Sequence, residues 1–285
     1  LSGSNYLVTN VATGSSANQR YVTVYPAPPS ITTGNNVYFH QLSNISTGGL
    51  VMEYVGSGVA AMDIDDRMTL CNHAAELGAK AAILEADEKT LLWLQAHGAK
   101  QPQPVKADQD AVYAQSIVVD TAQLAPQVAR KHQVDDIVSA HEVTHQKIQF
   151  ALIGTCTNGR LDDIRQAAAI LKGRQLAPGV RMIVTPASRK IYLDALREGL
   201  IEILTMAGAS FEAAGCGTCV GITNHLVPGN GDTVISTANR NFKGRLTNDR
   251  SEIWLGSAAT VAASALTGYI TDPRTVTGGE WRSIK

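Results

Sequence analysis

Three of the four cysteines of this chain lie in two short segments that are bracketed by glycines. Cys156 lies between Gly154 and Gly159, while Cys216 and Cys219 form a Cys-x-x-Cys pair that follows Gly215. Three thiolates are one fewer than a closed zinc site or a fully ligated four-iron cluster uses. A cubane cluster held by three cysteines leaves one iron open to water or substrate, and that iron can act as a Lewis acid. The pattern therefore favours an open iron–sulfur centre.

Apolar strand-like runs alternate with amphipathic helix-like segments from Gly48 onward. The sequence predicts strands at 50–55, 81–84, 150–153, 181–184, about 201–206 and 233–237, and helices at about 65–77, 88–97, 162–172, 188–198 and 257–266. Such alternation predicts an α/β fold with parallel sheets flanked by helices, and with sites at the carboxyl ends of the strands. Both cysteine segments are expected to lie in such positions.

The composition excludes several classes of protein. A net charge of −1 over 285 residues gives no global reason to expect nucleic acid or an acidic membrane surface as a partner. No apolar stretch approaches the length of a membrane-spanning helix, and the first residues lack the pattern of a signal peptide. Four cysteines do not make a disulfide scaffold, so a reducing, cytoplasmic location is expected.

The first 47 residues differ in texture from the rest of the chain. Arg20 is their only Lys, Arg, Asp or Glu, and Ser, Thr and Asn are abundant. Short β-favouring runs at 21–25 and 36–39 predict a β-rich arm. We therefore expect three parts: this atypical segment at 1–47, an α/β domain at 48–145, and a second α/β domain at 146–285 that carries the three cysteines.

Each cysteine segment also has a simpler interpretation. Cys156 is predicted to follow a strand and precede a helix, where backbone N–H groups favour a thiolate, but it could equally be a structural cysteine. Cys216 and Cys219 could form a redox pair, or half of a zinc site completed by Cys71 or a histidine. A redox pair has no need of Cys156, so the three cysteines together favour a cluster.

Two arginines lie five residues apart in the segment Ser236–Arg245. Arg240 and Arg245 follow a predicted strand and flank a glycine, so both can point into one cleft. Guanidinium groups bind carboxylates in a bidentate manner, with about 1.5–3 kcal/mol for each charge-assisted hydrogen bond. The alternative is a pair of solvated surface arginines.

Asn72 and Glu76 are four residues apart on a predicted helix and would share one face of it. A carboxylate near an open iron could take part in proton transfer or bind the water on the iron. From the residues alone, a solvated helix face is the better explanation of this pair.

Two further matches to known motifs are weaker. His141-Glu142-Val143-Thr144-His145 matches the His-Glu-x-x-His pattern of zinc proteases, but the stretch is short and polar and leads into a predicted strand. Gly56-Ser57-Gly58 matches part of a dinucleotide-binding pattern, but three acidic residues follow it and would repel a pyrophosphate. Neither motif is expected to be functional.

These motifs, in the order in which they occur along the chain, resemble those of the aconitase superfamily. The resemblance is closest to the large subunits of 3-isopropylmalate dehydratase and homoaconitase. The resemblance covers about residues 48–275 and includes Met52-Glu53-Tyr54, Asp66–Asn72, Ala75–Ala79, both cysteine segments, Asn239–Arg245, Gly256–Thr260 and Asp272-Pro273-Arg274. It implies two aconitase-like domains at 48–145 and 146–285.

The resemblance also implies roles for particular residues. Cys156, Cys216 and Cys219 would hold a [4Fe–4S] cluster, and Cys71 would neighbour the site without being a ligand. Asn72 and Glu76 would act as catalytic residues beside the cluster, while Asn239, Arg240 and Arg245 would bind near the cluster and the substrate carboxylates. The implied reaction is the reversible dehydration of a hydroxy-diacid such as 3-isopropylmalate, in leucine biosynthesis.

Two elements of the family pattern are absent from this sequence. The N-terminal domain of the family, with its Asp-Ser-His motif and His-Asp pair, is not found, and neither is the swivelling domain or small subunit. We therefore expect the chain to be the cluster-bearing part of a hydro-lyase that needs a small-subunit partner. The alternatives are a non-catalytic iron–sulfur sensor and a dithiol redox protein that uses Cys216 and Cys219.

Overall fold

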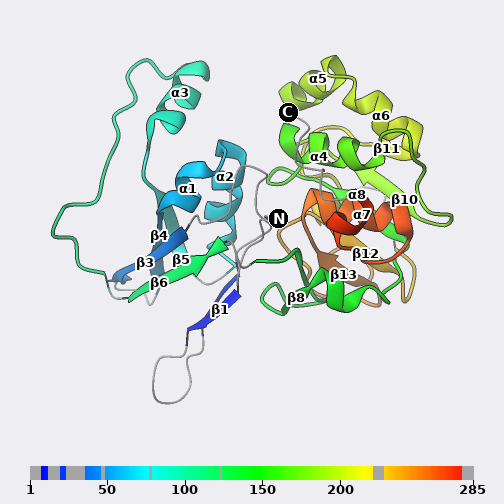
Figure 1. Cartoon of the computed structure of the whole chain (residues 1–285), viewed down its shortest axis with the longest axis horizontal. Helices are drawn as coiled ribbons and strands as arrows, with labels where there is room; N and C mark the ends of the chain where they lie inside the picture. The colour runs from blue at the N-terminus through cyan, green and yellow to red at the C-terminus, as the bar shows by residue number, and fades with distance from the viewer. Residues whose placement is uncertain are drawn as a thin grey trace. The chain divides into compact units, whose positions relative to one another are not determined.

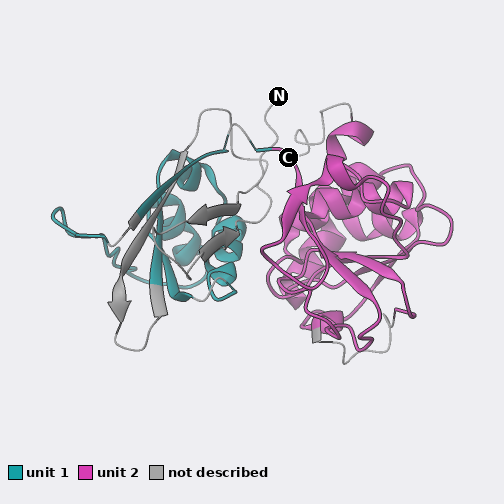
Figure 2. Ribbon diagram, turned by 90° about the horizontal axis from the view of Figure 1, so that it is seen from below, with its two compact units in different colours: residues 1–124 teal, residues 125–285 magenta. Residues whose placement is uncertain are grey.

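The computed structural model describes residues 8–11, 20–23, 36–45, 49–76, 79–113, 115–121, 124–220 and 228–277. The chain divides into two compact units, residues 1–124 and residues 125–285, which are described separately (Figure 2). Within the described ranges, no helix combines the length and the apolar character that crossing a membrane requires.

Unit 1 contains a four-stranded sheet in the order β5-β4-β3-β6. Strand β3 (Asn36–Ile45) runs antiparallel to β4 (Gly49–Val55) and to β6 (Gln115–Asp120), while β4 is parallel to β5 (Ala79–Leu84). A separate antiparallel pair joins β1 (Val8–Val11) to β2 (Arg20–Thr23). The parallel sheet expected in this part of the chain is therefore a mixed one, because β3 and β6 run against β4.

Helices α1 (Ser57–Ala61) and α2 (Ile64–His73) contact this sheet, and α3 (Glu88–Ala96) contacts α2 (Figure 1). Tyr54 from β4, Met62 from the α1–α2 connection and Leu70 from α2 are buried and form the core of this unit. The helix predicted to reach Leu77 ends at His73 and continues as a turn through Glu76, while Leu77 and Gly78 lie outside the described residues.

Unit 2 is built on a seven-stranded sheet in the order β11-β10-β9-β12-β13-β7-β8. The strands are β7 (Gln127–Ala129), β8 (Ile137–Ser139), β9 (Phe150–Ile153), β10 (Arg181–Val184), β11 (Ala209–Phe211), β12 (Thr233–Ser236) and β13 (Glu252–Leu255). The five from β11 to β13 are parallel, and β7 runs antiparallel to β13 and β8. All residues of β9 and β12 are buried, as expected for central strands of a parallel sheet.

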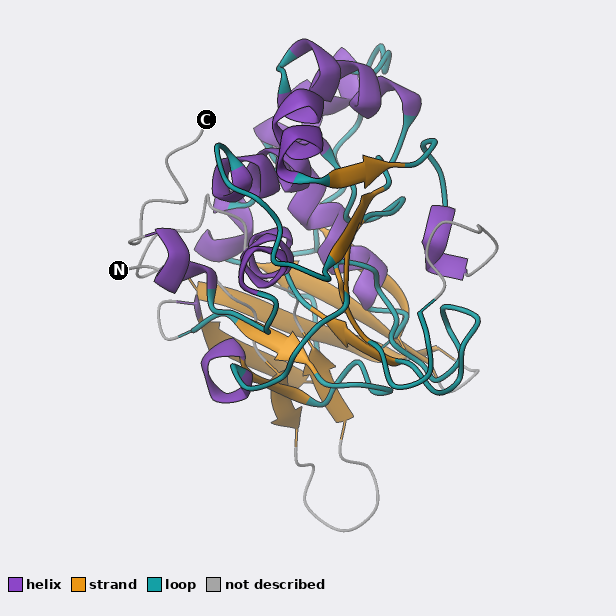
Figure 3. Ribbon diagram, turned by 90° about the vertical axis from the view of Figure 1, so that its right-hand side faces the viewer, coloured by secondary structure: helices purple, strands orange, loops and turns teal. Residues whose placement is uncertain are grey.

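Helices alternate with these strands along the chain (Figure 3). They are α4 (Leu161–Leu171), α5 (Arg189–Arg197), α6 (Leu200–Ala207), α7 (Ala258–Thr267) and α8 (Pro273–Thr277), with short 3₁₀ turns η2 (Ala140–Val143) and η3 (Gly217–Val220). The α/β architecture with a largely parallel sheet is as the sequence predicts.

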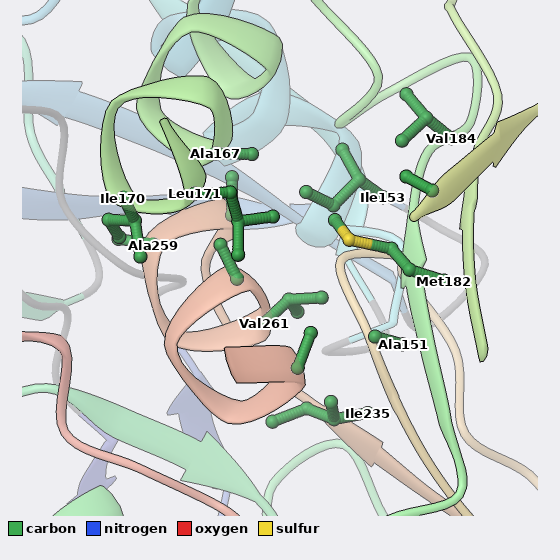
Figure 4. Close-up of a cluster of buried hydrophobic side chains, with 14 of the residues drawn as sticks. Ala151, Ile153, Ala167, Ile170, Leu171, Met182, Val184, Ile235, Ala259 and Val261 are labelled. Carbon is green, nitrogen blue, oxygen red and sulfur yellow. The ribbon is translucent and has the colours of Figure 1, made fainter. Parts of the chain in front are cut away.

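The core of unit 2 lies between the sheet and helices α4 and α7 (Figure 4). Eight consecutive residues of α7, Ala258–Ala265, are buried, and most of them are alanine, so α7 can approach α4 and β9 closely. The side chains from the strands and helices that meet there are Ala151, Ile153, Met182, Val184, Ile235, Ala167, Ile170, Leu171, Ala259 and Val261.

One predicted strand is wrong. Residues 201–206 belong to helix α6, and the short strand β11 follows them. Leu200, Leu204 and Ala207 are buried at helical spacing, whereas a short apolar run fits either a strand or a helix when read from sequence alone. Gly199 and Gly208 bound the helix in left-handed conformations, with φ of 73° and 108°.

The compact units differ from the domain boundaries expected from sequence. Strand β3 belongs to the sheet of unit 1 although it lies in the predicted segment 1–47, and the rest of that segment is mostly outside the described residues. Strands β7 and β8 belong to the sheet of unit 2 although they precede residue 146. The three-part division itself stays a prediction.

A buried arginine connects α2 to the start of α3 in unit 1. The Arg67 guanidinium donates two hydrogen bonds to the Asp87 carboxylate, at 2.7 and 2.6 Å, and one to Thr90 Oγ1 at 2.9 Å. Asp87 also caps α3 by accepting from the Thr90 backbone N–H. These hydrogen bonds from Arg67 hold the pKa of Asp87 well below its usual range.

We expect Asp87→Asn to lower the free energy of unfolding at pH 7 by about 1–3 kcal/mol, because Asn keeps the helix cap but loses the ion pair with a buried guanidinium. A carboxyl whose pKa is lower in the folded state stabilises the fold above its unfolded pKa of about 3.9, and the stabilisation declines as the pH falls further. The difference between wild type and variant should therefore shrink below about pH 4 in urea unfolding curves. Asp63→Asn, which removes an exposed pair with Lys89, should change stability by less than about 0.5 kcal/mol. An equal loss in both variants, or a loss from Asp87→Asn that does not decrease between pH 4 and pH 2, would contradict this account.

Candidate functional site

Four adjacent parallel strands of unit 2 end at the same edge of the sheet. These strands are β11, β10, β9 and β12, in that order. Cys156 follows β9, the pair Cys216 and Cys219 follows β11, and the segment Asn239–Arg245 follows β12. The fold therefore gathers the three cysteines and the predicted carboxylate-binding segment at one edge.

Two contacts connect the arginine segment to both cysteine loops. Asn239 Nδ2 donates to Thr157 Oγ1 at 3.1 Å, next to Cys156 in the chain. Arg245 Nη2 donates to Cys219 Sγ at 3.4 Å. Arg240 lies between these two residues in sequence and is half-buried. The three segments singled out from sequence thus come together in the structure.

Thr237 joins the end of β12 to the Cys156 loop. The Thr237 hydroxyl accepts a hydrogen bond from the Gly154 N–H at 2.9 Å. Its own hydrogen can be donated to the carbonyl oxygen of Gly154, at 2.7 Å, or to that of Asn158, at 3.1 Å. In return, Asn158 Nδ2 donates to the Thr237 carbonyl at 2.6 Å. Both side chains are buried, so these bonds fix the Cys156 loop against β12.

Thr185, at the end of β10, is fully buried between the two cysteine loops. A Cβ added at Gly159 would lie 2.2 Å from the Thr185 carbonyl oxygen, and one added at Gly154 would lie 3.1 Å from Thr185 Cβ. On the other side, a Cβ at Gly217 would lie 2.7 Å from Thr185 Cγ2 and 2.6 Å from Glu212 Oε2. Gly154, Gly159 and Gly217 are therefore required by close packing on Thr185 and on Glu212.

The three candidate ligands differ in exposure. Cys156 and Cys216 are exposed and Cys219 is half-buried, and all three are free thiols. In the ranges that the structure describes, no group of three or more His, Cys, Asp or Glu side chains is close enough to hold a metal ion. The structure brings the loops to one edge, and the convergence of their sulfur atoms on one cluster stays a prediction.

Two buried polar atoms at this edge point to a missing partner. Arg245 Nε and Thr218 Oγ1 are buried and have no hydrogen-bond partner among the described residues. Thr218 lies between Cys216 and Cys219, and Arg245 contacts Cys219. A bound anionic group would supply acceptors to both, so the donor set fits an iron–sulfur cluster, with Cys156, Cys216 and Cys219 as the thiolates that would hold it.

Asn72 and Glu76 belong to unit 1. Asn72 is exposed near the end of α2, and Glu76 is half-buried in the turn that follows, so the two do not share a helix face as predicted. Their role beside the cysteines stays a prediction. Cys71 is half-buried, its Sγ lies 3.7 Å from the Ala82 carbonyl oxygen, and burial raises the pKa of its thiol to about 11. Such a protonated thiol is a poor metal ligand at neutral pH.

The two weaker motifs lie in short elements of the structure. The 3₁₀ turn η2 covers Ala140–Val143, so His141 and His145 are not presented on the helix that a zinc protease motif requires. The glycine segment Gly56–Gly58 leads into α1, a helix of five residues.

Sequence reasoning missed four polar residues at this edge. Thr185, Thr237 and Glu212 are buried, and Arg160 donates from Nε to the Thr157 carbonyl at 3.2 Å in the Cys156 loop. The hydrogen-bond partners of Thr185, Thr237 and Glu212 lie 27 to 83 residues away in the chain. The partner of Arg160 is only three residues away. The only signal in the sequence was their position directly after strands or beside the cysteine motif.

We expect Gly217→Ala to destabilise unit 2 by about 1–3 kcal/mol and to change the alkylation rates of Cys216 and Cys219, because the new methyl group would overlap Thr185 and Glu212. The rates can be followed for each cysteine by mass spectrometry of the metal-free chain. Gly231→Ala is the matched control, since Gly231 also has a positive φ, of 83°, but has open space around its Cβ position. The control should show only the cost of the strained backbone, with unchanged alkylation rates. Equal effects of the two substitutions would show that packing on Thr185 does not shape this loop.

The model of the aconitase family, described as aconitate hydratase, matches residues 37–268. Large subunit 2 of 3-isopropylmalate dehydratase from Archaeoglobus fulgidus is 47% identical over 224 residues, which cover 78% of this chain and 54% of the relative. Large subunit 1 from Thermotoga maritima is 48% identical over 227 residues, with the same two coverages. A probable methanogen homoaconitase large subunit from Methanosarcina mazei is 46% identical over 225 residues, covering 79% of this chain and 56% of the relative.

The chain thus spans about half the length of these relatives. The family match covers both cysteine loops and the arginine segment that meets them at the sheet edge. The chain belongs to the aconitase family.

Proposed function

We propose that this chain is the cluster-bearing part of a hydro-lyase that reversibly dehydrates a hydroxy-diacid such as 3-isopropylmalate. The observation that carries the proposal is the contact between Arg245 and Cys219 at 3.4 Å, which puts a carboxylate-binding group against a candidate cluster ligand. The relatives support the reaction class, because they are named 3-isopropylmalate dehydratase and homoaconitase.

The residues at the sheet edge suit an anionic substrate. Arg240 and Arg245 offer guanidinium groups that can grip a carboxylate in a bidentate manner, and Arg160 adds a third positive charge from the Cys156 loop. Asn239 is anchored on Thr157 and can donate to a substrate oxygen from the same side. Positive charges in one place also raise the local concentration of a dianion.

A [4Fe–4S] cluster held by Cys156, Cys216 and Cys219 would supply an iron with an open position, which acts as a Lewis acid toward a hydroxyl group. The chain's own residues would position the diacid through Arg240 and Arg245. Glu76 carries a carboxylate that can accept or return a proton, and Asn72 can orient the substrate hydroxyl.

A small subunit is the proposed partner. The relatives are named as large subunits, and this chain covers about half of their length. We therefore expect the complete active site to include groups from outside this chain. The cytoplasmic location expected from the sequence stays a prediction.

The proposal can be tested by measuring the binding of 3-isopropylmalate to the chain after anaerobic reconstitution with iron and sulfide. Calorimetry should show binding to the iron-loaded chain and at least about tenfold weaker binding to Arg245→Gln, since a charge-assisted hydrogen bond contributes about 1.5–3 kcal/mol. Arg250→Gln is the matched control, because Arg250 is exposed in the same β12–β13 connection, and its affinity should be unchanged.

Iron content is measured on every variant first, so that a loss of affinity is not confused with a loss of cluster. An isopropylsuccinate probe, which lacks the hydroxyl, should bind more weakly than 3-isopropylmalate to the iron-loaded chain. Addition of a small subunit from a related dehydratase should then give formation of the unsaturated diacid, followed by ultraviolet absorption. An iron-loaded chain that binds neither probe, with or without the small subunit, would contradict the proposed function.

A further inference from the structure

Glu212 is a buried carboxylate beside the Cys-x-x-Cys loop that the proposed reaction does not use. It follows β11 directly and is 9% exposed. Thr185 Oγ1 donates to Glu212 Oε2 at 2.8 Å, and Thr185 itself is fully buried at the end of β10. A hydrogen bond from a buried hydroxyl holds the carboxylate in one orientation.

The carboxylate touches the backbone between the two cysteines. A Cβ built on Gly217 would lie 2.6 Å from Glu212 Oε2, and Gly217 is the residue between Cys216 and Thr218. The close approach is possible only because Gly217 has no side chain and takes a φ of +46°. A fixed negative charge therefore lies directly against the loop that carries two of the candidate ligands.

Two side chains of opposite charge contact the Cys-x-x-Cys loop. Arg245, from the segment after β12, donates to Cys219 Sγ at 3.4 Å, whereas Glu212 packs against Gly217. The reduction potential of an iron–sulfur cluster depends on nearby charge and on hydrogen bonds to its sulfur atoms. A negative charge stabilises the more oxidised cluster, and a donor to a ligating sulfur stabilises the more reduced one.

We propose that Glu212 is a positioning residue that lowers the reduction potential of the metal centre held by Cys216 and Cys219. The inference rests on the proposed function, because it requires that these cysteines hold a cluster. In the step concerned, one electron passes from an external reductant such as dithionite to the cluster, with no bond made or broken. Glu212 acts on this step through its charge, and Thr185 holds that charge against the loop.

The test is a redox titration of the reconstituted chain, followed by EPR, in wild type and Glu212→Gln. The amide keeps the shape of the side chain and an oxygen that can accept from Thr185, but it removes the charge. The potential should rise in Glu212→Gln and stay close to the wild-type value in Glu212→Asp, which keeps the charge. Glu202→Gln, which removes an exposed carboxylate from α6, should not shift it.

Thr185→Val separates the charge of Glu212 from its orientation, since it removes the hydrogen bond that holds the carboxylate but keeps the carboxylate itself. An unchanged potential in Glu212→Gln, or an equal shift in Glu212→Asp and Glu212→Gln, would overturn the inference. So would a Glu212→Gln chain that fails to take up iron while Thr185→Val takes it up, because the charge would then serve assembly rather than the potential. A wild-type chain that takes up no cluster would instead overturn the proposed function on which the inference rests.

Discussion

The site depends on the close packing of two glycine-containing loops around Thr185. This residue directly follows β10, the strand between β9 and β11, so it lies between the Cys156 loop and the Cys-x-x-Cys loop. Side chains at Gly154, Gly159 or Gly217 would overlap Thr185 or its partner Glu212. Gly154, Gly159 and Gly217 thus have a physical reason, since a backbone without side chains at these positions lets both loops approach one buried threonine.

The parallel order of β11, β10, β9 and β12 determines which groups meet at this edge. The segment after β12 contacts both cysteine loops, through Asn239 on one side and Arg245 on the other. The guanidinium of Arg245 therefore lies against the Cys219 thiol, and the buried Glu212 carboxylate packs against Gly217 of the same loop. This distribution is the basis of the proposed binding of an anionic substrate and of the proposed effect of Glu212 on a metal centre.

The sequence predicted the strands 150–153 and 181–184 with the bounds that the structure has, because both are short buried runs that end at polar turns. It failed at 201–206, where apolar residues at helical spacing form α6. The cysteines and the arginine segment were visible as motifs, and the comparisons confirm the family that they indicate. Thr185, Thr237 and Glu212 could not be predicted, since their importance comes from partners 27 to 83 residues away that only the folded sheet brings near. The roles of Asn72 and Glu76 stay predictions.

The central claim, that Cys156, Cys216 and Cys219 together hold one cluster, is tested most directly by iron and sulfide analysis after anaerobic reconstitution. The wild-type chain should take up about four irons and give the EPR signal of a three-iron cluster after mild oxidation. Each of Cys156→Ser, Cys216→Ser and Cys219→Ser should lose the cluster, while Cys71→Ser, which removes the half-buried thiol of unit 1, should keep it. A Cys156→Ser chain that binds as much iron as the wild type, or a wild-type chain that takes up only zinc, would contradict the claim.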